Sequence, residues 1–326
     1  MKYKMTQGRL FIGLNLFFLL ISFKSLVFAN NVDDWAGPLE NAHKLLAKQQ
    51  YSDALIAFKE QANLGNGLAE FNVALIYDLG WGIKPIRSTA CQWYRKAAKS
   101  NMPAAMQALG HCFIEGQGVK QNKKHGYKWF LNAFEHGIAD GGCHAGTLLL
   151  IGDGIEADVE TGKNLCIKSA QQGSIFAQSQ LAHWYFHGQY FPQDYQQSFT
   201  WLQAAASAKS PDSAYLLATF YDQGIGMNVD EKQALYWYEI AALGKYQQAY
   251  LPTALLYWKT FTEADSNNKE KVLAKSYLWA KTLLISSSSS AEKDIAKKLL
   301  THVLQEIPTT WLENLDEKVA NHLAVL

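Results

Sequence analysis

Small and large residues recur along the middle of this chain at a fixed spacing of 36 positions. Small residues form one such column: Ala74, Gly110, Gly146, Ala182, Ala218 and Ala254. Three positions later stands a column of large residues: Tyr77, Phe113, Leu149, Tyr185, Tyr221 and Tyr257. A spacing of three places both columns on one side of a helix. Repetition at this period is typical of a solenoid, in which each unit packs on its neighbours.

The second half of each unit predicts another helix. Its marker is a tryptophan with an alanine four positions later: Trp93 and Ala97, Trp129 and Ala133, Trp201 and Ala205, Trp237 and Ala241. Glycines favour helix ends and left-handed loop positions. They separate the two halves at Gly80, Gly116, Gly152, Gly188 and Gly224, and again at Gly82, Gly118, Gly154 and Gly226. We therefore expect pairs of antiparallel helices in complete units at residues 67–102, 103–138, 139–174, 175–210 and 211–246.

This combination resembles the Sel1-like repeat family, which is related to tetratricopeptide (TPR) repeats. The residues that carry the resemblance are Leu109, Gly110, Phe113, Gly116, Gly118 and Val119, with Trp93, Tyr94, Lys96, Ala97 and Ala98. It covers residues 67–260 and implies an all-α fold, a right-handed α-α superhelical solenoid of Sel1-like or TPR-like helix pairs. In one unit Tyr190 replaces the second loop glycine, so we expect that loop to have a different shape.

Residues 1–29 have the composition of a signal peptide. A basic start precedes an apolar stretch from Leu10 to Phe23, and the segment ends in small or modest residues at Ala29. The stretch is short for a spanning helix, which needs roughly 20 apolar residues. Cleavage after Ala29 is the expectation, with an uncleaved anchor as the alternative.

The flanks of the repeats predict further helices. Residues 30–66 are expected to form an N-terminal TPR-like helix pair, and residues 261–326 a degenerate repeat followed by C-terminal capping helices. A serine run, residues 286–290, should separate the last of these helices. The final helix is expected to begin after Pro308 with threonine caps.

Four cysteines, an even number, suit disulfides in a chain that is expected to be exported. Cys91 and Cys112 are about equally far from the turn between their helices, and Cys143 and Cys166 are equally far from the loop between theirs. Antiparallel packing would place each pair at one height, which is a necessary condition for a bond. The alternative is four buried thiols. Cysteine-rich members of the family bridge their helices at a shorter spacing, so the resemblance does not fix these bonds.

Charge and motifs exclude several functions. The whole chain has 30 basic and 29 acidic residues, and removal of residues 1–29 leaves 26 basic and 29 acidic residues, a formal net charge of −3. A chain with this charge lacks the basic stripe of a nucleic-acid-binding protein. No nucleophile elbow, phosphate-binding loop or distinctive carboxylate pair is present, so we expect no catalytic residue and no cofactor. His183 and His187 share a helix side but lack further ligands, so we expect surface histidines and no metal.

Binding function should therefore depend on residues of the first helix of each pair that lie outside the packing columns. The candidate partner-binding residues are Phe71, Asp78, Gln107, His111, Glu115, Ser179, His183, Phe186, His187, Tyr215, Thr219, Asp222 and Gln223. The first helices of such a solenoid line its concave face, and this mixture of aromatic and polar groups suits a protein or peptide partner. For the apolar members, packing against neighbouring units is an equal alternative. His111, His183, Asp222 and Gln223 are expected to be solvated.

The leading hypothesis is a non-enzymatic, exported adaptor that binds another protein or a peptide. The resemblance implies a periplasmic or secreted protein of a Gram-negative envelope, with a role in envelope complex assembly or in host interaction and virulence. One alternative is a cell-wall or β-lactam-related envelope enzyme or small-molecule binder. Another is a structural subunit held by an uncleaved N-terminal anchor. No feature of the sequence specifies an oligomeric state.

Overall fold

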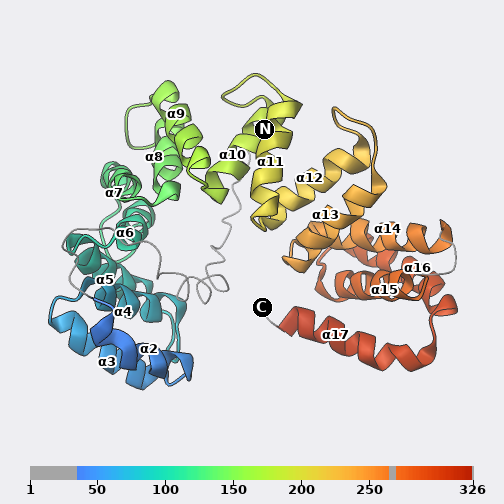
Figure 1. Ribbon diagram of the computed structural model, residues 1–326, viewed down its shortest axis with the longest axis horizontal. Helices are drawn as coiled ribbons and strands as arrows, with labels where there is room; N and C mark the ends of the chain where they lie inside the picture. Colours follow the sequence, from blue (N-terminus) through green and yellow to red (C-terminus); the bar gives the residue numbers. More distant parts are fainter. Residues whose placement is uncertain (1–34, 264–268, 325–326) are drawn as a thin grey trace. The chain divides into compact units, whose positions relative to one another are not determined.

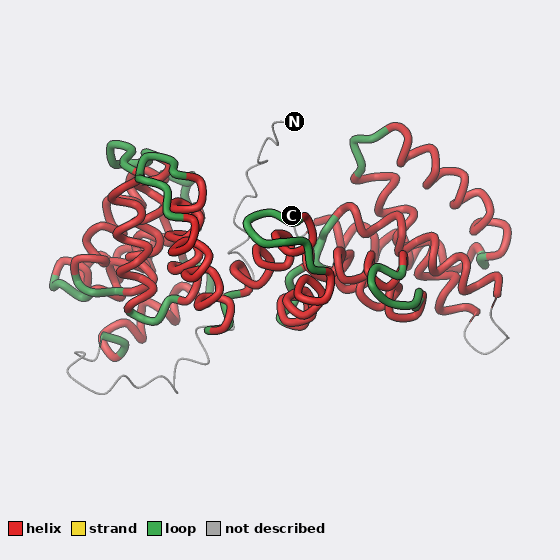
Figure 2. Tube along the Cα trace, turned by 90° about the horizontal axis from the view of Figure 1, so that it is seen from above, coloured by secondary structure: helices red, strands yellow, loops and turns green. Residues whose placement is uncertain are grey.

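The computed structural model describes residues 35–263 and 269–324, which consist of α-helices and short 3-10 turns joined by loops, without a β-strand in these ranges (Figure 2). The helices are α2 (Glu40–Ala47), α3 (Tyr51–Asn63), α4 (Gly67–Leu79), α5 (Arg87–Lys99), α6 (Pro103–Glu115), α7 (Lys123–Glu135), α8 (Ala139–Ile151), α9 (Val159–Gln171), α10 (Ile175–His187), α11 (Tyr195–Ser207), α12 (Pro211–Gln223), α13 (Glu231–Leu243), α14 (Tyr250–Glu263), α15 (Lys269–Ser286), α16 (Ser290–Glu306) and α17 (Leu312–Ala324). The expected all-α solenoid of helix pairs is confirmed. The predicted signal peptide lies outside the described residues.

Contacts divide the chain into two compact units. Unit 1 includes residues 35–148 and 152–157, and unit 2 includes residues 149–151 and 158 onward. Within each unit, helices adjacent in sequence pack side by side, for example α4 with α5 and α12 with α13 (Figure 1). We call the five helix pairs α4/α5, α6/α7, α8/α9, α10/α11 and α12/α13 repeats 1 to 5.

Local sequence signals set the helix ends. Side-chain oxygens of N-cap residues accept backbone N–H groups at the starts of several helices, for example Asn66 from Ala69 and Asp194 from Gln197. The first helix of every repeat ends at a left-handed glycine, as expected: Gly80, Gly116, Gly152, Gly188 and Gly224.

The loop expected to differ, at Tyr190, keeps the backbone conformation of the others. Tyr190 has φ 61°, in the same left-handed region as Gly118 at 64° and Gly226 at 70°. Its ring packs edge-on against Trp184 at a centroid distance of 5.2 Å. The prediction of a different loop shape is therefore wrong, because the loop position accepts a side chain where there is room for it.

The core consists of residues from the repeat columns, but in the second helices the core position is one residue after the tryptophan. Leu109, Leu181 and Leu217, which occupy the same repeat position, are fully buried. In the second helices the tryptophans are only partly buried. The residue after each tryptophan is the one in the core: Tyr94, Phe130, Leu202 and Tyr238.

Helices also flank the repeats. The serine run separates α15 from α16, and Ser289 caps α16 by accepting the N–H of Glu292. The threonines after Pro308 form a 3-10 turn without a side-chain cap, so that part of the prediction is wrong. No helix in the described ranges has both the length and the apolarity required to cross a bilayer.

The second loop-glycine column allows a matched test of crowding. A Cβ at Gly226 would lie 3.6 Å from Tyr195 Cβ, whereas one at Gly118 would lie 2.3 Å from the Ser88 carbonyl oxygen. Gly226→Ala should lower the free energy of unfolding by about 1 kcal/mol, because only left-handed strain is added. Gly118→Ala should cost about 2 kcal/mol more, since backbone must also move. Urea unfolding measures both, and equal losses would show that crowding at Gly118 has no effect.

Candidate partner-binding surface

The candidate residues lie on first helices, and the structure separates them by exposure. In unit 1 they are on α4 and α6, and in unit 2 on α10 and α12. Glu115, His187 and Gln223 are exposed, Ser179 is buried, and the rest are partly buried. The surface therefore has a few exposed side chains among others that are largely covered by their neighbours.

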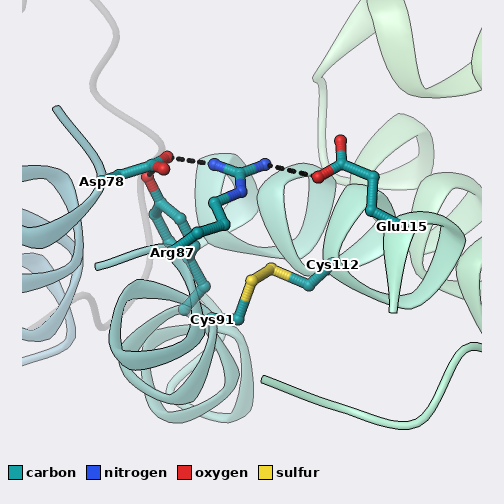
Figure 3. Close-up of a disulfide and its surroundings, with 6 residues drawn as sticks. Asp78, Arg87, Cys91, Cys112 and Glu115 are labelled. Atoms are coloured by element: carbon teal, nitrogen blue, oxygen red, sulfur yellow. Dashed lines mark hydrogen bonds and ion pairs between the residues drawn. A yellow bond between two sulfur atoms is a disulfide. The ribbon is translucent and has the colours of Figure 1, made fainter. Parts of the chain in front are cut away.

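In unit 1 the main polar feature is an arginine that connects two repeats (Figure 3). Arg87, at the start of α5, pairs with Asp78 of α4 through Nη1, and its Nη2 lies 3.5 Å from Glu115 Oε2 on α6. Tyr94 also donates its hydroxyl to Asp78 at 2.9 Å. Burial, and then the charge of Asp78, raise the pKa of Tyr94 well above its ordinary value. Tyr94 therefore remains a hydrogen-bond donor.

A disulfide lies beside this arginine. Cys91 and Cys112 are bonded, with their Cα atoms 5.8 Å apart, which confirms the predicted pair (Figure 3). Arg87 and Cys91 are four residues apart on α5, and Cys112 and Glu115 are three apart on α6, so each charged residue shares a helix side with a bonded cysteine. The covalent link thus holds Arg87 near Glu115. Cys143 and Cys166 are disulfide-bonded as well, and no cysteine is free.

His111 does not occupy the solvated position expected for it. Its ring packs edge-on against Phe130 at 4.9 Å and against His144 at 4.7 Å, and its buried Nε2 has no hydrogen-bond partner among the described residues. Burial, followed by the neighbouring His144 and Arg87, lowers the pKa of His111 to about 3. Burial lowers the pKa of His144 to about 4. His111 is a neutral core residue at neutral pH, so its prediction as a surface residue is wrong.

In unit 2 the side chains of α10 are partly used for packing. The hydroxyl of Ser179 lies 2.6 Å from that of Ser213 in a buried cluster, so it is not available to a partner. Phe186 packs on Tyr195 and Phe220, with centroid distances of 5.7 and 5.6 Å. These two residues chiefly join α10 to α11 and α12.

The two histidines of α10 lie side by side at the surface. The rings of His183 and His187 are nearly parallel, with centroids 6.3 Å apart. His183 Nε2 is 3.9 Å from a carboxylate oxygen of Asp212. Burial and then His183 lower the pKa of His187. Across the described ranges, no three His, Cys, Asp or Glu side chains form a group that could hold a metal ion.

On α12, aromatic and polar candidates come together. Tyr215 packs against Tyr238 at 5.5 Å and against Tyr246 at 5.1 Å. Tyr238 donates its hydroxyl to Asp222 at 3.2 Å, with Thr219 Oγ1 at 3.4 Å. Burial is the main cause of the raised pKa of Tyr238. Gln223 is exposed beside Asp222.

Sequence reasoning missed Arg87 and the hydroxyl role of Tyr94 and Tyr238. A signal was present, because Asp78 with Tyr94 and Asp222 with Tyr238 occupy the same repeat positions. Treating both tyrosines only as core residues hid this pairing.

A family model described as the Sel1 repeat matches residues 67–102, 103–138, 143–174, 175–210 and 211–246. The chain belongs to the Sel1 repeat family. Proteins with this fold are generally non-catalytic scaffolds for protein interactions. The solved structure of a Sel1 repeat protein from Oxalobacter formigenes is similar, with a TM-score of 0.63 and 25% identity, and the match covers 80% of this chain and 99% of that one.

Two curated relatives match 60% or more of the chain. Chitin synthase regulatory factor 3 of Schizosaccharomyces pombe is 26% identical over 204 residues, which is 60% of this chain and 22% of that protein. Uncharacterized protein NMB1327 of Neisseria meningitidis is 24% identical over 215 residues, or 65% of this chain and 44% of that protein. The chain thus spans less than half the length of these two relatives.

The buried histidines of this Sel1 repeat protein predict acid sensitivity. Folding lowers the pKa of His111 and His144 below the ordinary value of about 6.5, so the unfolded chain binds more protons below that pH. Stability is complete above pH 6.5 and should fall by up to about 1.4 kcal/mol per pH unit for each histidine as the pH drops toward 4. His111→Phe keeps a ring and should reduce the loss between pH 7.5 and 5.0 by about 2 kcal/mol in urea unfolding.

The exposed His125 provides the control for this experiment. His125→Gln removes an exposed imidazole, so it reports the effect of replacing a histidine outside the core. Identical pH profiles for His111→Phe and the native protein would contradict the assignment of His111 as a buried, neutral side chain.

The Cys91–Cys112 bond closes a loop with a sequence separation of 21. Replacing both cysteines with alanine should lower the free energy of unfolding by about 3 kcal/mol, because the unfolded chain gains freedom. Urea unfolding in oxidising buffer measures the difference. In excess dithiothreitol the native chain and the variant should unfold alike, and a difference that persists there would assign the effect to packing.

Proposed function

We propose that this Sel1 repeat protein is an exported adaptor that binds another protein or a peptide through the exposed face of its first helices. The observation that carries the proposal is that these helices have exposed side chains, Glu115, His187 and Gln223, and partly exposed aromatic residues such as Tyr215. Aromatic groups with a polar surround are typical of protein interfaces.

The relatives support a role through binding. The Schizosaccharomyces pombe relative is named a chitin synthase regulatory factor, a name that gives it a regulatory role. In this chain the site residues are held by hydrogen bonds, ring packing and ion pairs within the repeats, an arrangement that positions side chains for recognition. We therefore propose a partner protein and no chemical reaction.

Export is supported by two features. The composition of residues 1–29 is that of a signal peptide, and all four cysteines are in disulfides, which persist in oxidising compartments such as the periplasm. We propose a periplasmic or secreted adaptor in envelope assembly or host interaction. A soluble fragment that begins at Asn30 in periplasmic extracts would support cleavage, and a full-length, membrane-bound chain would contradict it.

Partner capture tests the binding face. The triple variant Glu115→Ala, His187→Ala and Gln223→Ala changes exposed first-helix side chains and should keep the fold. A matched control, Gln92→Ala, Gln203→Ala and Gln233→Ala, changes exposed residues of second helices. With the mature chain as bait in extracts of its own organism, we expect the first triple variant to lose at least tenfold of a specific partner, and the control to keep it. A partner retained by both would place the binding surface elsewhere.

A further inference from the structure

Repeats 1 and 5 contain the same three-residue arrangement. The repeat 1 site consists of Phe71, Asp78 and Tyr94, and the repeat 5 site consists of Tyr215, Asp222 and Tyr238, at the same repeat positions. In both, the tyrosine of the second helix donates to the aspartate of the first, at 2.9 Å in repeat 1 and 3.2 Å in repeat 5. In both, a first-helix ring packs on that tyrosine, at 5.7 and 5.5 Å.

The repeat 1 site already has a cation. The guanidinium of Arg87 pairs with Asp78 and also with Glu115 of the next repeat. An Asp–Tyr pair of this form therefore accepts a guanidinium, and in repeat 1 the chain provides it.

The repeat 5 site has lost this cation. At the position of Arg87, repeat 5 has Glu231, and at the position of Glu115 the following helix α14 has Lys259. Lys259 donates to Glu231 at 2.5 Å, so the link between successive helix pairs is kept with reversed charges. The raised pKa of Lys259 is due first to that hydrogen bond, with Asp222 its smallest cause. Asp222 has no ion pair within the described residues.

The charges around the repeat 5 site are not balanced. Asp222, Glu231 and Glu263, the last with a carboxylate oxygen 4.0 Å from Lys259 Nζ, give three negative charges against one positive charge, or −2. The same count in repeat 1, Asp78 and Glu115 against Arg87, gives −1. Asp222 is partly exposed, so a positive group from outside can reach it.

We propose that the repeat 5 site binds an arginine side chain of the protein partner, with its guanidinium on Asp222 and its plane against Tyr215. The assignment rests on the proposed adaptor function and gives the chemistry of the partner. Arginine is favoured over lysine because its planar, delocalised group pairs with a carboxylate and stacks on an aromatic face at the same time. It is also the group that fills the equivalent site in repeat 1.

A small probe tests the site without the partner. The probe is N-acetyl-arginine methylamide, titrated into the ¹⁵N-labelled mature chain, with its neutral isostere N-acetyl-citrulline methylamide as the ligand control. We expect amide shifts in α12 and α13 that saturate with arginine at millimolar concentration, and at least tenfold weaker binding of citrulline. No shift in these helices, or equal binding of both probes, overturns the proposal.

Matched substitutions locate the bound group. Asp222→Asn removes the charge and keeps an oxygen that accepts from Tyr238, so the arginine probe should bind at least tenfold more weakly. Asp78→Asn, at the same position in repeat 1, should leave the probe affinity of the repeat 5 site unchanged, since Arg87 covers Asp78. An affinity that is insensitive to Asp222→Asn overturns the proposal.

A filled site gives a second, independent readout. Glu231→Arg restores the residue of repeat 1 and should occupy Asp222 from within the chain. Glu231→Gln is its control, because both changes release Lys259. Probe binding to Glu231→Arg should be at least fivefold weaker than to Glu231→Gln, and equal affinities contradict the assignment.

Failure of this inference can be distinguished from failure of the proposed function. Partner capture that depends on the first-helix triple variant, combined with no arginine binding, overturns this inference alone. Capture that survives in the triple variant overturns the proposed binding face, whatever the titration gives.

Discussion

Four of the five helix pairs are held together by one large side chain of the second helix that packs against the first helix. This residue follows the repeat tryptophan and is buried in four repeats as Tyr94, Phe130, Leu202 and Tyr238. Its space depends on the small column of the first helix. At Gly110, an added Cβ would lie 2.6 Å from the ring of Phe130. Because overpacking of this kind moves helices apart, the small column and the large residue have to change together.

The same contact creates the polar part of the surface. A phenylalanine or a leucine at this position needs no partner, but a buried tyrosine requires one for its hydroxyl. Only repeats 1 and 5 have a tyrosine there, and both place an aspartate within reach, Asp78 and Asp222. The candidate binding groups are thus a consequence of core packing, with the carboxylate held at the surface by a side chain whose ring is in the core.

Sequence periodicity predicted the structural features that depend on contacts inside one repeat. Helix pairs, their boundaries and the glycine helix ends follow from local spacing, and the structure has them at the expected positions. The burial of His111 could not be predicted this way, because it also depends on the ring of His144 on α8, in the next repeat. The buried hydroxyl of Ser179 likewise depends on Ser213 in the next repeat. Contacts between repeats depend on side-chain direction, which a column of residue types does not contain.

One kind of contact between repeats is an ion pair that joins successive helix pairs. Arg87 with Glu115 and Glu231 with Lys259 occupy the same pair of positions with opposite polarity, so what is kept is a link between successive helix pairs. When the second helix provides the arginine of this ion pair, the arginine also pairs with the nearby aspartate, as Arg87 does with Asp78. When the second helix provides a glutamate, as at Glu231, the ion pair between helix pairs is kept, but the aspartate, Asp222, has no ion-pair partner among the described residues. Reversing the pair therefore leaves the scaffold intact and converts an internal ion pair into an open carboxylate, which is how a repeat protein can gain a recognition group without a change in its core.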